Sequence, residues 1–405
     1  MLEANPETKV TDSAVFRGSN QSGLRDHNER LVLSLIQRFG PKPGVEIARL
    51  IGLSSQTVSV ILRDLETEGL IKRGTPQRGR VGKPSVPMML DPSGAFSIGL
   101  KIGRRSADLV LIDLVGETRL HHTVTYRFPK PDPLLAFVNE GIERCAHLLP
   151  AGSFKRIAGI GVAKPFEIWN WHETIGAPMA DMEAWRAFDF EGTISRATGL
   201  PVYIENDATA ACRAENTSGR GREFRDFAYF FIGAFVGGGV VLNHSIFEGF
   251  HGNAGAFGSL PSIDNQSGAE QLIDAASLYL LESRLAESGL DATRMWEPPH
   301  DWSEFETHVD LWIEQAAEHL ARAAMTACSV IDFQAVLIDG AFPEAVRKRL
   351  VERVRALIAN LDTRGLVVPR IEEGLVGRNA RALGAASAPI FAQYLINTNG
   401  RLASV

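Results

Sequence analysis

The sequence is poor in cysteine, with three among 405 residues: Cys145, Cys212 and Cys328. They are far apart, and each lies in an apolar or alanine-rich stretch that has the pattern of a helix. This spacing argues against a disulfide framework and favours buried free thiols in a reducing compartment. The ten histidines show no metal-ligand spacing. We therefore predict no metal site and no cofactor.

Long hydrophobic runs are also missing. No stretch approaches the roughly 20 uninterrupted apolar residues of a membrane span, and the N-terminus lacks the apolar centre of a secretory signal. Residues 1–20 are polar and without periodicity, which predicts a disordered tail. We expect a cytoplasmic protein with no membrane partner, whose length suffices for two or three domains.

Acidic residues are scarce in one part of the chain. Residues 21–90 hold eleven Lys/Arg against six Asp/Glu, a net charge of +5, although the whole chain carries −6. The remaining residues therefore sum to −11. A basic module on an acidic body indicates that only the module meets a polyanion, and we predict that this partner is double-stranded DNA.

Residues 21–90 have the pattern of a winged helix-turn-helix. Residues 28–39 carry apolar side chains at helical spacing and end at Gly40-Pro41. Residues 45–51, with Ile47, Leu50 and Ile51 inward, are short enough for the second helix. A turn at residues 52–54 then leads into a third helix that runs to about residue 68, with Ser54 or Ser55 as its N-cap.

The third helix is predicted to have one apolar and one polar side. The core side holds Val58, Ile61, Leu62 and Leu65. The outward and leading side holds the residues expected to touch DNA bases and phosphates: Ser55, Gln56, Thr57, Ser59 and Arg63.

A basic loop follows this helix. Residues 71–90 hold five basic residues and no acidic one, and residues 86–90 can pair as a strand with the segment after Gly69. Arg78, Arg80 and Lys83 lie between the two strands, where flexible cations suit a narrow minor groove. The alternatives are a winged helix that contacts proteins, or a basic loop that is only solvated.

Further along the chain, an acidic segment precedes two glycine-rich runs. Glu205-Asn206-Asp207 ends a predicted strand and begins a helix, and residues 232–243 and 252–259 are rich in glycine. Asp207 could serve as a base, or simply as the N-cap of the helix over residues 208–215. These segments resemble the signature region of the ROK family, which contains sugar kinases and sugar-responsive transcription repressors. The basic loop resembles the wing of its repressors.

The resemblance covers about residues 24–395 and implies an α/β fold: a winged helix-turn-helix followed by a two-lobe, actin-like and ribonuclease-H-like ATPase-type unit. It places the first lobe at residues 91–208 with 380–405, and the second at residues 209–379. In ligand-binding members the cleft between the lobes holds a sugar. The resemblance implies that here Asn206, Asp207, Phe166, Gly238 and Asn253 line that cleft.

The groups that kinases of this family use are altered here. By resemblance, Lys101 stands where the kinases place a metal-positioning Asp, and Ala234-Phe235 stands where they place a Thr-Gly pair for phosphates. Ala256 and Ser259 replace a Glu and a His, and residues 260–290 contain no cysteine to complete the family's zinc site. This predicts a protein that is not an enzyme. An alternative is that residues 101–105 bind a phosphate directly.

The function predicted from these observations is a DNA-binding transcription regulator. We expect a repressor of carbohydrate transport or catabolism genes, released by a sugar or sugar-like effector. It would act as a homodimer or homotetramer on a pseudo-palindromic operator. Two alternatives remain: an active sugar kinase with an added DNA-binding module, and a DNA-binding protein whose cleft is closed by Phe166 and Phe235.

Overall fold

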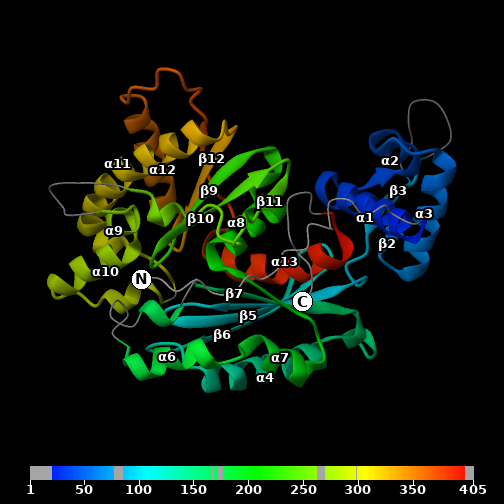
Figure 1. Ribbon diagram of the computed structural model, residues 1–405, viewed down its shortest axis with the longest axis horizontal. Helices are drawn as coiled ribbons and strands as arrows, with labels where there is room; N and C mark the ends of the chain where they lie inside the picture. The colour runs from blue at the N-terminus through cyan, green and yellow to red at the C-terminus, as the bar shows by residue number, and fades with distance from the viewer. Residues whose placement is uncertain are drawn as a thin grey trace, which may run out of the picture.

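A computed structural model describes residues 21–76, 85–165, 168–171, 177–261, 270–297 and 299–396. The chain forms a helical N-terminal module beside two lobes, each built on a five-stranded sheet (Figure 1). The predicted disordered tail at residues 1–20 lies outside the described residues. No single helix in the described part of the chain is long and apolar enough to cross a membrane, although the bent pair formed by residues 44–51 and 55–68 passes on length and composition.

The N-terminal module is the winged helix-turn-helix that the sequence predicts. Its elements are α1 (Gln21–Phe39), β1 (Lys42–Pro43), α2 (Gly44–Ile51), α3 (Ser55–Glu68), β2 (Ile71–Arg73) and β3 (Pro87–Leu90). Helix α3 leaves α2 at a bend of 117°, within the range of a helix-turn-helix. Ser54 is the N-cap of α3, and Gly69 ends that helix in the left-handed conformation.

Two details of the module differ from the prediction. Leu50 was expected to face inward, but it is 48% exposed, because the short helix α2 buries only Ile47 and Ala48. Strand β1 was not predicted. It pairs with β3 through Lys42 and Met88, so the sheet has the order β1-β3-β2.

The two lobes repeat one sheet topology. The first sheet has the order β6-β5-β4-β7-β8, and the second has the order β11-β10-β9-β12-β13. In each, the first three strands of the lobe are antiparallel and the last two run parallel to the first. This repeated topology is the one that the resemblance implied.

The strands of the first sheet are β4 (Phe96–Ile102), β5 (Ser106–Asp113), β6 (Thr118–Thr125), β7 (Ile157–Lys164) and β8 (Val202–Asn206). The strands of the second are β9 (Phe227–Ile232), β10 (Val236–Leu242), β11 (Ser245–Phe247), β12 (Ala335–Gly340) and β13 (Arg370–Glu373). The short 3-10 helices are η2 (Ser153–Arg156), η3 (Ile168–Trp171), η4 (Arg220–Glu223), η5 (Phe257–Ser259), η6 (Ala292–Met295), η7 (Ser303–Phe305) and η8 (Gly377–Asn379).

Helices cover both sheets. Helices α4 (Pro131–Leu148), α6 (Met179–Ala187) and α7 (Phe190–Thr198) lie on one face of the first sheet, and α13 (Ala380–Tyr394) lies on the other (Figure 1). The second sheet is flanked by α8 (Asp207–Ser218) and by a group made of α9 (Ile273–Ala276), α10 (Leu278–Glu287), α11 (Glu306–Val330) and α12 (Glu344–Ile358).

Helix α13 is packed closely between the first sheet and α8. Small residues permit this approach: a Cβ added at Gly384 would lie 1.6 Å from the carbonyl oxygen of Ala210 on α8. A Cβ at Gly161 on β7 would lie 1.8 Å from the carbonyl oxygen of Ala385. Larger side chains at either glycine would push α13 away from its neighbours, so the closing helix has little room to move independently.

The N-terminal module is joined to the lobes by packing and by polar contacts. Its apolar core continues into side chains of β5 and α13. The Arg30 guanidinium donates to the carbonyl of Ala392 on α13 at 3.2 Å. Arg38 donates to the carbonyl of Arg222 at 3.1 Å, and Arg222 donates back to the carbonyl of Gln37 at 3.1 Å. The module is therefore held at two places, on α13 and on η4.

Candidate functional sites

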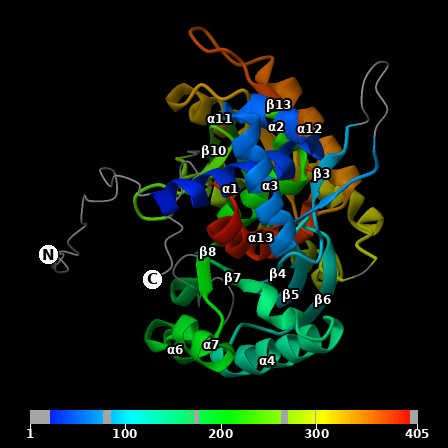
Figure 2. The same ribbon diagram turned by 90° about the vertical axis from the view of Figure 1, so that its right-hand side faces the viewer.

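The outward side of α3 is the first candidate site. All five residues predicted to touch DNA on this helix are exposed: Ser55, Gln56, Thr57, Ser59 and Arg63. Figure 2 shows α3 on the face turned to the viewer, with no other element in front of it. The core residues Val58, Ile61, Leu62 and Leu65 are all buried, as predicted.

Not all of these polar groups are equally free. Ser54 Oγ accepts the backbone N–H of Thr57 at 3.1 Å and lies 2.8 Å from the Thr57 hydroxyl. The Ser59 hydroxyl donates to the carbonyl of Ser55 at 2.8 Å. Within the described residues, the side chains of Gln56 and Arg63 make no hydrogen bond or ion pair, so both can reach an external partner.

An apolar residue on this surface was missed. Val60 is 48% exposed and lies on α3 between Gln56 and Arg63. Val60 lies outside the buried apolar stripe of α3, and this position in the helix could have predicted its exposure. An exposed methyl group beside polar donors suits contact with the methyl of thymine.

The basic loop is described only at its base. Lys72 pairs with Asp91 at 3.7 Å, and Arg73 pairs with Glu66 at 2.9 Å, so these two cations are used within the module. The predicted DNA-contacting residues of the loop, Arg78, Arg80 and Lys83, lie outside the described residues.

The second candidate site is a cavity of about 320 Å³ between the two lobes. Four of the five predicted ligand residues line it: Asn206, Asp207, Gly238 and Asn253. The fifth, Phe166, lies outside the described residues. These four residues come from the Glu-Asn-Asp segment and from the two glycine-rich runs.

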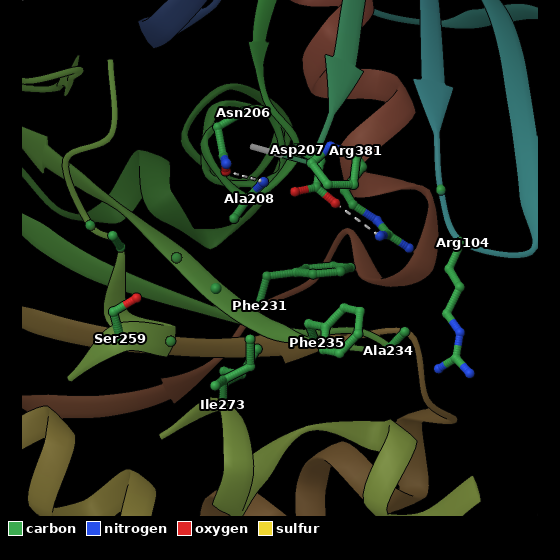
Figure 3. A pocket seen from close by; sticks show the side chains of 18 of the residues that line it. Arg104, Asn206, Asp207, Ala208, Phe231, Ala234, Phe235, Ser259, Ile273 and Arg381 are labelled. Carbon is green, nitrogen blue, oxygen red and sulfur yellow. Dashed lines mark hydrogen bonds and ion pairs between the residues drawn. The ribbon is translucent and has the colours of Figure 1, made fainter. Parts of the chain in front are cut away.

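Asn206 and Asp207 make different contacts, which bears on whether Asp207 is the N-cap of α8. Asn206, rather than Asp207, is the N-cap of α8, and its side-chain oxygen accepts the backbone N–H of Ala208 at 2.9 Å. The capping role predicted for Asp207 was therefore wrong, because the helix begins one residue earlier. The Asp207 carboxylate instead accepts a hydrogen bond from Arg381 at 3.1 Å (Figure 3).

Arg381 is a cleft residue that the sequence did not reveal. It lies in the first turn of α13, and its guanidinium lies 5.0 Å from the ring centre of Phe231, which also lines the cavity. Glu205, the first residue of the Glu-Asn-Asp segment, points elsewhere. It is paired at 2.9 Å with the buried Arg213, which also reaches Glu248 at 3.3 Å, so its contacts are structural.

Lys101 is buried and has partners within its own lobe. Its ammonium lies 3.0 Å from the Asp108 carboxylate and 2.8 Å from the Ser106 hydroxyl. Burial lowers the pKa of Lys101 to about 8, although Asp108 opposes this shift. Burial alone would raise the pKa of Asp108, but Lys101 and the hydrogen bonds from His121 and Thr123 hold it well below its usual range. A cation thus occupies the end of β4.

The turn between β9 and β10 is fixed against the start of α10. The carbonyl of Gly233 accepts the backbone N–H of Leu278 at 3.0 Å, and that of Ala234 accepts the N–H of Tyr279 at 3.1 Å. The Phe235 ring lies 5.4 Å from the Tyr279 ring. Carbonyl oxygens therefore use the first N–H groups of this helix, which a phosphate would otherwise contact.

Two arginines from the first lobe reach the second. Arg104 and Arg105, between β4 and β5, lie 3.4 and 3.6 Å from the carboxylate of Glu282 on α10. Arg104 also lines the cavity, whereas Arg105 does not. In the described part of the chain, no group of three or more His, Cys, Asp or Glu residues is placed to hold a metal ion.

Comparisons with known proteins agree with this architecture. Residues 97–389 match the model of the ROK family, and residues 22–80 match that of the MarR family. The uncharacterized protein y4fQ of Sinorhizobium fredii is 26% identical over 379 residues, which cover 91% of each chain. The NagC dual regulator of Escherichia coli is 21% identical, over 80% of this chain and 82% of NagC. The xylose repressor of Bacillus spizizenii is 26% identical, but the match spans only 60% of this chain and 62% of the repressor.

Solved structures show the same fold. A ROK family transcriptional regulator, a homologue of the E. coli Mlc protein, is similar with a TM-score of 0.66 and 20% identity, over 91% of this chain and 97% of that one. A ROK family glucokinase from Streptomyces griseus is similar with a TM-score of 0.56 and 19% identity, over 72% and 98% of the two chains. Since the family model matches well over half of the sequence, the chain belongs to the ROK family.

Proposed function

We propose that this protein is a DNA-binding transcription regulator that represses genes of carbohydrate transport or catabolism in the cytoplasm. The observation that carries the proposal is the exposed polar side of α3, on which Gln56 and Arg63 have no partner within the described residues. The MarR-type match over residues 22–80 and the repressor names of several relatives support it. In this reading α3 enters the major groove, and the basic loop with Arg78, Arg80 and Lys83 reaches the minor groove.

The second part of the proposal is that the cleft binds an effector without transferring a phosphoryl group. Phosphoryl transfer depends on positioning and on neutralising phosphate charge with metal ions. Lys101 places an ammonium at the end of β4, and the turn at Ala234 and Phe235 is fixed against α10. These contacts support the absence of kinase activity. Asn206, Asp207, Gly238, Asn253 and Phe166 are the proposed effector contacts.

Helix α13 offers a physical connection between the two sites. Its first turn carries Arg381, which pairs with Asp207 in the cavity. Its last turns contact the N-terminal module, through the carbonyl of Ala392 and through a shared apolar core. An effector that binds one arrangement of the lobes more tightly would shift α13, and the module with it. The resulting change in DNA affinity is limited by the difference in the effector's affinity for the two arrangements.

We further propose that the regulator acts as a homodimer or homotetramer. Two copies of α3 would then contact half-sites separated by about one helical turn, roughly 34 Å, or a multiple of it. The operator is accordingly expected to be pseudo-palindromic, since a twofold pair of modules reads a twofold sequence.

The test is selection of genomic fragments by the full-length protein, followed by sequencing. The proposal predicts enrichment of a few pseudo-palindromic fragments beside carbohydrate transport or catabolism genes, and loss of that enrichment for Arg63→Ala. Enrichment of no sequence over input DNA by the wild-type protein would refute the proposal.

An active sugar kinase is the second candidate function. Asp207 lines the cavity as a base would, and the ROK glucokinase from S. griseus shares the fold of the lobes. A coupled ATP assay with a panel of hexoses distinguishes the two candidates. Turnover that Asp207→Asn abolishes would establish the kinase, and turnover at background level for every sugar would support the regulator.

A further inference from the structure

Two guanidinium groups lie at one side of the cleft cavity. Arg104 comes from the turn between β4 and β5, and Arg381 comes from the first turn of α13 (Figure 3). Each has a buried Nε–H group with no hydrogen-bond partner among the described residues. Buried N–H donors are usually paired in folded proteins, so these two cavity-lining arginines have donor capacity that their present partners leave unused.

The present partners of these arginines leave room for a ligand. Arg104 meets Glu282 through one nitrogen at 3.4 Å, which is long for a charge-assisted hydrogen bond. Arg381 uses one nitrogen for Asp207 at 3.1 Å. A guanidinium has five N–H donors in a planar fork, a geometry that matches the two oxygens of a carboxylate or a phosphate.

The charges around this side of the cavity favour an anion. Arg104 and Arg381 are the cationic residues among the described residues that line the cavity. Asp207 is the one carboxylate among the described lining residues, which leaves one positive charge in excess. The excess positive charge in a partly buried site would attract an anionic group.

The rest of the lining suits a small polyol. Phe231 and Phe235 present rings, whereas Asn253 and Ser259 present polar groups. The volume of about 320 Å³ is at the lower end of ligand sites, which are about 300–1,000 Å³, so it suits a monosaccharide rather than a dinucleotide.

We infer that the effector is a monosaccharide-sized polyol carrying a carboxylate or phosphate group, which binds Arg104 and Arg381. This inference rests on the proposed function of the cleft as an effector site. It assigns ligand contact to Arg104 and Arg381 and not to Lys101, whose ammonium is already paired with Asp108 and Ser106. The inference therefore names which cations of the first lobe contact the ligand.

The test is isothermal titration of the full-length protein with gluconate, glucuronate, glucose 6-phosphate and glucose at constant ionic strength. At least one of the three anionic compounds is expected to bind roughly tenfold or more tighter than glucose. Comparison of the sugar acids with the sugar phosphate distinguishes a carboxylate site from a phosphate site. Arg104→Gln is expected to weaken anionic binding about tenfold and to leave any glucose binding unchanged.

Arg105→Gln is the matched control, because Arg105 also pairs with Glu282 but does not line the cavity. It should leave anionic binding within about twofold of wild type. Equal losses in the two variants, binding of glucose as tight as that of the anions, or binding of none of the four compounds would overturn the inference. Operator binding measured on the same preparations reports separately whether the proposed regulatory function stands.

Discussion

At the scale of single residues, Lys101 is a buried cation of the first lobe. Its ammonium is buried at the end of β4, and burial lowers its pKa to about 8 even though Asp108 lies 3.0 Å away. A lysine in an unfolded chain has a pKa of about 10.4. Between these two pKa values, Lys101 binds more protons in the unfolded chain than in the folded protein. The contribution of Lys101 to the free energy of unfolding therefore rises with pH.

This argument gives a measurable pH dependence. We expect the wild type to gain stability relative to Lys101→Met as the pH rises. The difference in the free energy of unfolding, wild type minus variant, should increase from about pH 8 to about pH 10. Urea unfolding at a series of pH values measures it. Lys348→Met, which changes an exposed lysine on α12, is the control for the general effect of losing a lysine. A difference that stays constant across this range would contradict the buried cation.

Arg80 is the residue through which minor-groove contact can be tested. It lies in the basic loop, and a lysine or arginine that neutralises one phosphate contributes about 0.9 to the slope of log K against log salt. Arg80→Ala should therefore weaken DNA binding on all sequences and reduce the slope by about one. Salt titrations of DNA binding measure both quantities, with Lys348→Ala as control. An unchanged slope would count against contact by this loop.

At the scale of elements, the N-terminal end of helix α3 is stabilised by one capping residue, Ser54. Ser54 Oγ accepts the N–H of Thr57, and this contact fixes the end of the helix that is proposed to meet DNA. Ser54→Ala should lower the free energy of unfolding of the module by about 1 kcal/mol, while Ser54→Asp, which retains a cap acceptor, should restore most of it. Thermal unfolding measures the difference. Equal stability of the alanine and aspartate variants would show that the cap contributes little.

Elements governed by local rules were predictable from the sequence. The limits of α3 followed from a cap, a stripe of four apolar residues and a terminal glycine. Strand β1 was missed because its two residues pair with β3, a distant part of the chain. Leu50 was misplaced because apolar character does not specify which side of a short helix is covered.

The cleft was predictable only in part, for the same reason. Asn206 and Asp207 were found through a resemblance in continuous sequence. Arg381 was not, since it is 174 residues from Asp207 and reaches it only because α13 folds back on the first lobe. The same holds for Glu215 on α8, whose carboxylate accepts the N–H groups of Arg220, Leu375 and Val376. Such contacts depend on the tertiary fold rather than on local sequence.

At the scale of the whole molecule, the position of the module relative to the lobes matters most. Arg38 donates to the carbonyls of Arg222 and Phe224 and so holds α1 against η4 and the residue that follows it. Arg38→Ala should loosen the module. In a dimer, a full operator gains affinity from two linked contacts, so the ratio of full-operator to half-site affinity should fall by roughly threefold to tenfold.

Fluorescence anisotropy with full-operator and half-site duplexes measures that ratio. Arg225→Ala is the matched control, because Arg225 pairs with Asn243 and Asp226 and has no hydrogen bond or ion pair with the described residues of the module. The half-site affinity itself should be unchanged in Arg38→Ala, since the surface of α3 is intact. A ratio equal to that of the wild type would mean that these contacts do not position the module.

The most direct measurement is an anisotropy titration of the full-length protein against the operator recovered from genomic selection and against a scrambled duplex of equal length and composition. At about 0.15 M salt we predict that the operator binds at least roughly a thousandfold tighter than the scrambled duplex. Equal affinity for the two duplexes would contradict sequence-specific DNA recognition by this protein.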